Sequence, residues 1–92
     1  MKNLYQQIDL LETSTKEKGK LFQAIMFAKT HELNYHQLKR FLEEEIKLYT
    51  ILADKEIEDD EYTKGFEEKR KMFSQLLQLA TKWEEFIKTK IL

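Results

Sequence analysis

The chain contains no cysteine and no proline, and its only glycines are Gly19 and Gly65. Without cysteine, disulfide bonds, thiol catalysis and cysteine-ligated zinc are all excluded. Glycine and proline supply most tight turns, and an all-β chain needs many of these, so their scarcity favours a few long helices. Small secreted domains commonly depend on disulfides, so the lack of cysteine indicates a reducing, cytoplasmic location.

Long apolar runs and an excess of one charge are missing too. The longest run of apolar residues is only five residues, 24–28, whereas a membrane-spanning helix needs roughly 20. Met1 is followed by polar residues, so we expect no signal peptide. Sixteen Lys and Arg against seventeen Asp and Glu give a net charge of −1, without the basic excess typical of general nucleic-acid binders. We therefore expect a soluble cytoplasmic protein with no membrane span.

Apolar residues recur at helical spacing over most of the 92 residues, which we interpret as one domain spanning 1–92. The clearest stretch is 59–92, where two adjacent apolar rows predict one long amphipathic helix with a broad buried face. These rows comprise Tyr62, Phe66, Phe73, Leu76, Ala80, Trp83 and Ile87, and Met72, Leu79 and Phe86. A second helix is expected over 35–54, with Asn34 as its N-cap.

Residues 2–31 allow two interpretations. The apolar stripe resumes in register after the hydrophilic segment 12–20, which favours one helix that is kinked or frayed near 13–19. Ser14 and Glu17 have capping-box spacing, which favours two separate helices. We expect the single helix, and so an all-α antiparallel bundle of three long helices, or of four if the first one breaks.

The sequence offers little catalytic chemistry. His31 and His36 are five residues apart, whereas the zinc-protease motif needs histidines four apart on one helix, so we expect two exposed histidines flanking a turn. No Glu-x-x-His pair is present for a di-metal site in a bundle, and neither Ser14 nor Ser74 has a sequence signature of an activating base. We expect no enzyme activity, cofactor or metal. The acidic turn 54–61 is interpreted as solvated capping residues, with a loose cation site left open.

Residues 21–28 are apolar nearly all round, so this segment is either covered on more than one side or exposed to a partner. We expect a non-enzymatic protein that acts through protein–protein contact or self-association, as an adaptor, inhibitor or immunity-type factor. The expected partner-binding residues are Leu21, Ala24, Phe27, Trp83 and Phe86, and Tyr5 is expected to be exposed as well. The alternative is a nucleic-acid-associated protein that uses Lys64, Lys69, Arg70 and Lys71.

One local pattern resembles a known family. Residues 56–62, Glu-Ile-Glu-Asp-Asp-Glu-Tyr, running on to the basic segment 67–72, resemble the short bacterial helical-hairpin modules of the SHOCT type, with Glu56 where a glycine usually stands. The resemblance covers less than a quarter of the chain and implies a capped helix, not a function. Size, charge and helical build are also similar to the immunity proteins of bacteriocin producers, and the Lys-, Glu- and Ile-rich composition suggests a bacterial or phage origin.

Overall fold

Five helices make up the fold in the computed structural model, which describes residues 2–55 and 61–91, with only the backbone given for residues 55 and 61–64. They are α1 (Leu4–Asp9), α2 (Thr15–Thr30), α3 (Tyr35–Lys55), α4 (Glu61–Lys82) and α5 (Glu84–Ile91). No strand occurs in these ranges, so the predicted all-α class is confirmed. Two of the expected long helices are each divided in two, which is why the count is five.

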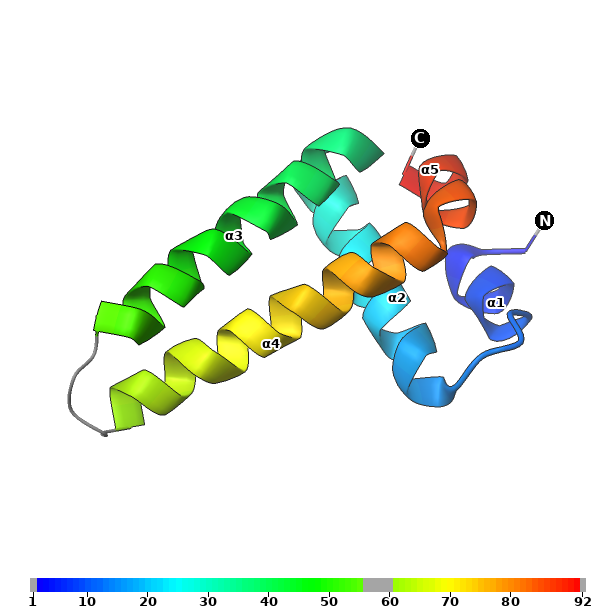
Figure 1. The fold of residues 1–92 in the computed structure, drawn as a ribbon. Coiled ribbons are helices and arrows are strands. Elements are labelled where there is room, and N and C mark those ends of the chain that lie inside the picture. The colour runs from blue at the N-terminus through cyan, green and yellow to red at the C-terminus, as the bar shows by residue number, and fades with distance from the viewer. Residues whose placement is uncertain (1, 56–60, 92) are drawn as a thin grey trace.

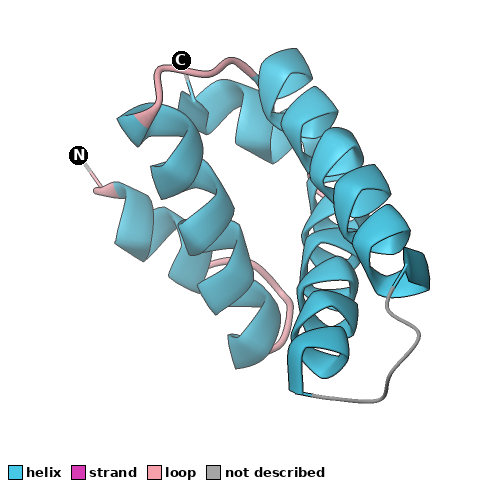
Figure 2. Ribbon diagram, turned by 90° about the vertical axis from the view of Figure 1, so that its left-hand side faces the viewer, coloured by secondary structure: helices cyan, strands magenta, loops and turns pink. Residues whose placement is uncertain are grey.

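The two longest helices, α3 and α4, form an antiparallel hairpin along which the molecule extends (Figure 1). Helix α2 crosses one face of this hairpin near the end away from the connecting turn, α1 packs on α2, and α5 closes that end (Figures 1 and 2). The overall extents are 52 × 25 × 20 Å. We call residues 45–55 of α3 and 61–71 of α4 the arm, and the remainder the base.

The hydrophobic core lies in the base, where all five helices meet. Its fully buried large side chains are Leu21, Ile25, Leu38 and Ile87. Half-buried side chains, including Phe41, Phe73 and Leu76, pack around this cluster. Tyr49 and Phe66 pack in the arm instead, outside the core cluster.

The expected single helix over residues 2–31 is wrong, and the two-helix alternative is correct. Ser14 has an extended backbone, and its side chain accepts a hydrogen bond from the backbone N–H of Glu17 at 3.2 Å, so it starts α2 as an N-cap. Asn3 and Gln6 form a complete capping box that starts α1 independently. The break lets α1 pack back on α2, where the rings of Tyr5 and Phe22 meet edge to face at 5.6 Å.

Helix α2 ends in a Schellman motif that uses a glutamate where glycine is usual. Glu32 has φ 55°, the left-handed region that L-residues rarely adopt. The backbone N–H of Leu33 donates to the carbonyl oxygen of Ala28 at 2.8 Å, and that of Glu32 to Lys29 at 3.2 Å. These two bonds satisfy carbonyl groups that the helix end would otherwise leave free.

The expected single helix over residues 59–92 is also corrected, because it turns at Trp83. Trp83 still donates its backbone N–H to Leu79 at 2.9 Å and accepts from Ile87 at 2.9 Å, yet α5 leaves the axis of α4 (Figure 1). The turn places Ile87 in the core with no exposed surface. Glu84 and Glu85 lie in the first turn of α5, where acidic side chains suit the positive end of the helix dipole.

Candidate interaction surfaces

The residues expected to form an exposed partner patch do not form one. Leu21 is 1% exposed and Ala24 is 6% exposed, and Leu21 belongs to the core cluster. Residues 21–28 are apolar nearly all round, and the structure covers them on more than one side, since the α3–α4 hairpin lies on one side of α2 and α1 packs on part of another (Figure 2). Phe27, Trp83 and Phe86 are half-buried, whereas Tyr5 is 64% exposed, as expected.

An apolar groove does lie at the place where α2 crosses the hairpin. It has a volume of about 230 Å³, and among the described residues Gln23 is its only polar lining residue. The ring of Phe41 lies between those of Phe27, at 4.9 Å, and Phe73, at 6.3 Å. The other lining residues are Ala24, Leu38, Leu42, Met72 and Leu76. Of the expected patch, only Ala24 and Phe27 line this groove.

Apolar side chains continue from the groove along the same side of the arm. Leu48 and Leu52 follow Phe41 by two and three helical turns, which places all three on one side of α3. Between the helices, the ring of Tyr49 stacks on Phe73 at 5.7 Å. We call this surface, which starts at Phe41 and Met72 in the groove of the base and continues in the arm with Tyr49, Leu48, Leu52 and Phe66, the arm strip. Leu48 is 46% exposed and Met72 is 43% exposed, a large fraction for such side chains.

The sequence places Met72 in one of the two apolar rows of 59–92 and identifies neither Met72 nor Leu48 as exposed. The spacing of these residues marks them as members of an apolar stripe, and it gives no indication of where a covering helix stops. Only the position of α2, which covers the base and leaves the arm open, separates the exposed part of the stripe from the buried part.

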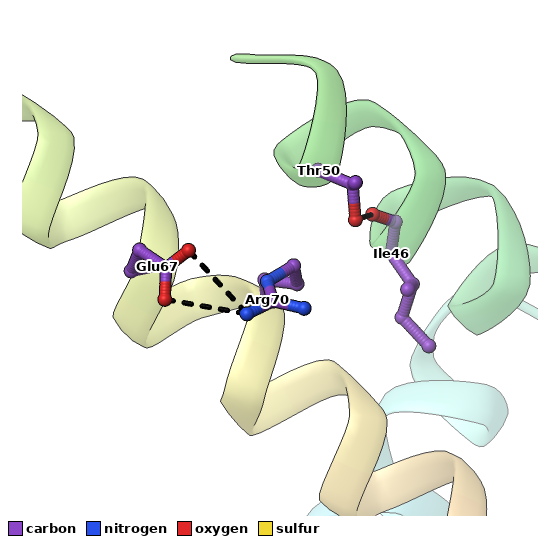
Figure 3. Close-up of polar contacts among 4 residues, drawn as sticks. All are labelled: Ile46, Thr50, Glu67 and Arg70. Atoms are coloured by element: carbon purple, nitrogen blue, oxygen red, sulfur yellow. Dashed lines mark hydrogen bonds and ion pairs between the residues drawn. The ribbon is translucent and has the colours of Figure 1, made fainter. Parts of the chain in front are cut away.

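The side chains of the predicted basic patch point in different directions. Arg70 forms an ion pair with Glu67 of its own helix at 3.2 Å (Figure 3). The ammonium group of Lys69 lies 5.4 Å from the centre of the Tyr49 ring, whereas Lys71 is exposed. Consecutive residues of a helix point about 100° apart, so these three cannot meet one flat partner together. The side chain of Lys64 lies outside the described residues.

Basic side chains converge instead in a second groove, between the first half of α2 and the last turns of α4. This groove, of about 280 Å³, is lined by Lys16, Lys20, Lys82, Glu17, Gln75, Gln78 and Leu79. Lys20 donates a hydrogen bond to the side-chain oxygen of Gln75, which links the two helices. We call it the lysine groove.

Of the carboxylates in the described part of the chain, only Glu17 lines the lysine groove. A hydrogen bond from the Thr13 hydroxyl lowers the pKa of Glu17, and the ammonium group of Lys82, at 3.6 Å, lowers it further against the opposing effect of burial. Glu17 is therefore ionised at neutral pH. Its contribution to stability is present above its pKa in the unfolded chain and is lost as the pH falls through its pKa in the folded chain.

The two histidines flank the turn between α2 and α3 and are both exposed, as expected. The ring of His31 packs on Phe27 at 4.3 Å, and that of His36 lies against Tyr35 at 5.7 Å. Among the described residues, no group of three His, Asp or Glu side chains is placed to hold a metal ion. The acidic turn expected as a cap or cation site lies largely at residues 56–60, outside the described ranges.

Within the described ranges, no helix is both long enough and apolar enough to cross a lipid bilayer. Comparisons with known protein families, with curated proteins and with solved structures found no match to this chain.

Proposed function

We propose that this protein is a non-enzymatic binding protein that holds an amphipathic helix of another protein along its arm strip. The observation that carries the proposal is that Leu48 and Met72 are exposed beside an open apolar groove. A soluble chain of this size seldom leaves such side chains in one continuous surface unless a partner covers them.

The base supports a helix as the occupant. There α2 crosses the hairpin and packs on α4, with Ala24 and Phe27 at the groove. Along the arm, no described helix covers this face of the hairpin, although its apolar side chains continue there. A helix of a partner protein, with apolar residues spaced three and four apart, would cover that face of the arm, as α2 covers the hairpin in the base.

The proposal is tested by placing a photo-crosslinking amino acid at position 48 of the full chain, in the cells that produce the protein. We expect one adduct with a second, different protein. Met72→Glu on the same chain should abolish this adduct, because a charge at the groove opposes burial of an apolar helix. Leu10→Glu is the matched control, since Leu10 is 63% exposed at the C-cap of α1, outside the strip, and the adduct should persist in this variant.

Circular dichroism of both variants establishes that they remain folded. An adduct of twice the chain mass would show that the strip joins two copies and would overturn the hetero-partner proposal. An adduct that persists in the Met72→Glu variant, or no adduct in any chain, would overturn the binding role of the strip.

A further inference from the structure

We propose that the lysine groove binds a compact phosphate-bearing anion, of the size of a pyrophosphate or the phosphate chain of a nucleotide. Three ammonium groups line it, from Lys16 and Lys20 one turn apart on α2 and from Lys82 on α4. Against them stands the single carboxylate of Glu17, so the lining carries two more positive than negative charges.

The placement of Lys16 runs against the usual charge pattern of a helix. Lys16 and Lys18 lie in the first turn of α2, at the positive end of its dipole, where cations are unfavourable. Of these two side chains, only that of Lys18 donates a hydrogen bond within the described part of the chain, to the backbone oxygen of Asp9 at 2.8 Å. Glu17 is the only acidic residue there. A residue that violates a local rule commonly does so for function, and Lys16 is the one that also lines the groove.

Charge is also segregated over the whole molecule. Although the net charge is −1, residues 69–83 contain no acidic residue and residues 13–31 contain only Glu17. The two helices that form the lysine groove therefore carry a local basic excess, which favours an anion there. The acidic remainder of the chain disfavours a long polyanion that would run past the groove.

The groups of the groove suit phosphate oxygens. Lys16 has no ion-pair partner among the described residues, and Lys20 donates only to the neutral amide of Gln75. Gln75 and Gln78 add amide N–H donors that can turn toward a ligand, because amides donate and accept equally well. The volume of about 280 Å³ fits a di- or triphosphate and not a duplex. Charge-assisted bonds from several ammonium groups are the usual means of holding such oxygens.

The test is titration calorimetry of the full chain with pyrophosphate and, separately, with a nucleoside triphosphate, at about 100 mM salt so that diffuse surface charge is screened. We expect submillimolar binding. Losing two charge-assisted contacts in Lys16→Gln/Lys20→Gln should weaken it at least roughly tenfold. Lys29→Gln is the matched control, because Lys29 is exposed in the last turn of α2 and does not line the groove. It should change the affinity less than about twofold.

Glu17→Gln gives a second readout, because removing the one carboxylate should tighten binding. Equal weakening by Lys29→Gln would show diffuse attraction and overturn the proposal. Absence of binding to both phosphate ligands would overturn it as well, and so would binding only of a single-stranded oligonucleotide, which would point to a nucleic-acid surface. Tighter binding of the nucleoside triphosphate than of pyrophosphate would identify a nucleotide as the ligand within the proposal.

Discussion

The hydroxyl of Tyr35, the first residue of α3, donates a hydrogen bond at 3.3 Å to the backbone oxygen of Ala80, near the end of α4. Both residues are almost fully buried, at 4% and 1% exposure. The bond joins residues 45 positions apart and fixes the start of one hairpin helix against the end of the other. The ammonium group of Lys88 lies 5.4 Å from the centre of the same ring, so α5 also contacts this junction.

Replacing Tyr35 by phenylalanine should lower the free energy of unfolding by about 1 kcal/mol, since it removes one buried hydrogen bond and keeps the ring. Urea denaturation followed by circular dichroism measures this change. Tyr5→Phe is the control, because Tyr5 is 64% exposed and its hydroxyl is open to water. Equal stability of the two variants would show that the bond to Ala80 contributes nothing.

The same bond should make the protein sensitive to alkali. Burial raises the pKa of Tyr35 above its usual value of 10.0, and the nearby carboxylate of Glu84 raises it further. The unfolded chain therefore loses this proton at a lower pH than the folded chain. The stabilisation is complete below pH 10 and falls as the pH rises through the folded-state pKa.

Other groups titrate in this range, so the measurement is the stability difference between the wild type and Tyr35→Phe, followed from about pH 8 to 11. We expect this difference to be constant up to about pH 10 and then to decrease. A difference that grows with pH would contradict the assignment.

Neighbouring residues of α2 should respond very differently to truncation. Ile25 has no exposed surface, whereas Met26, the next residue, is 40% exposed. Ile25→Ala should cost about 2–5 kcal/mol, because it leaves a cavity in the core. Met26→Ala should cost less than about 1 kcal/mol, because most of that side chain contacts water already. Thermal or urea unfolding of both variants measures these changes in the free energy of unfolding. Equal decreases in the two variants would mean that α2 is not covered as described.

The comparison of sequence and structure turns on where helices end. Hydrophobic spacing predicts the helical class and the antiparallel pairing of residues 35–54 with the last long helix, because periodicity depends on which face is buried. It does not locate the breaks. The stripe stays in register from Leu4 to Ile25, but Ser14 caps a new helix within it. Glu32 ends α2 in a left-handed conformation that no local signal assigns to a glutamate.

The candidate surfaces were harder to predict for a related reason. Leu21 and Leu48 are both leucines on apolar stripes, yet one is buried and the other is 46% exposed. Only the crossing position of α2 distinguishes them. The lysine groove likewise joins residues 16–20 with residues 75–82, and no sequence spacing reveals that these segments lie together. Trp83 is a further case, since its place in the apolar row hides the turn into α5.

The arm continues from the base through the uninterrupted helices α3 and α4. The length of the arm can therefore change without a change in the core of the base. Inserting seven residues at matching levels of both helices would add two turns to each, or about 10 Å, and keep the inward faces aligned. The core around Ile25 and Ile87 would be untouched. Variants of this chain with arms of different length would therefore keep the same base.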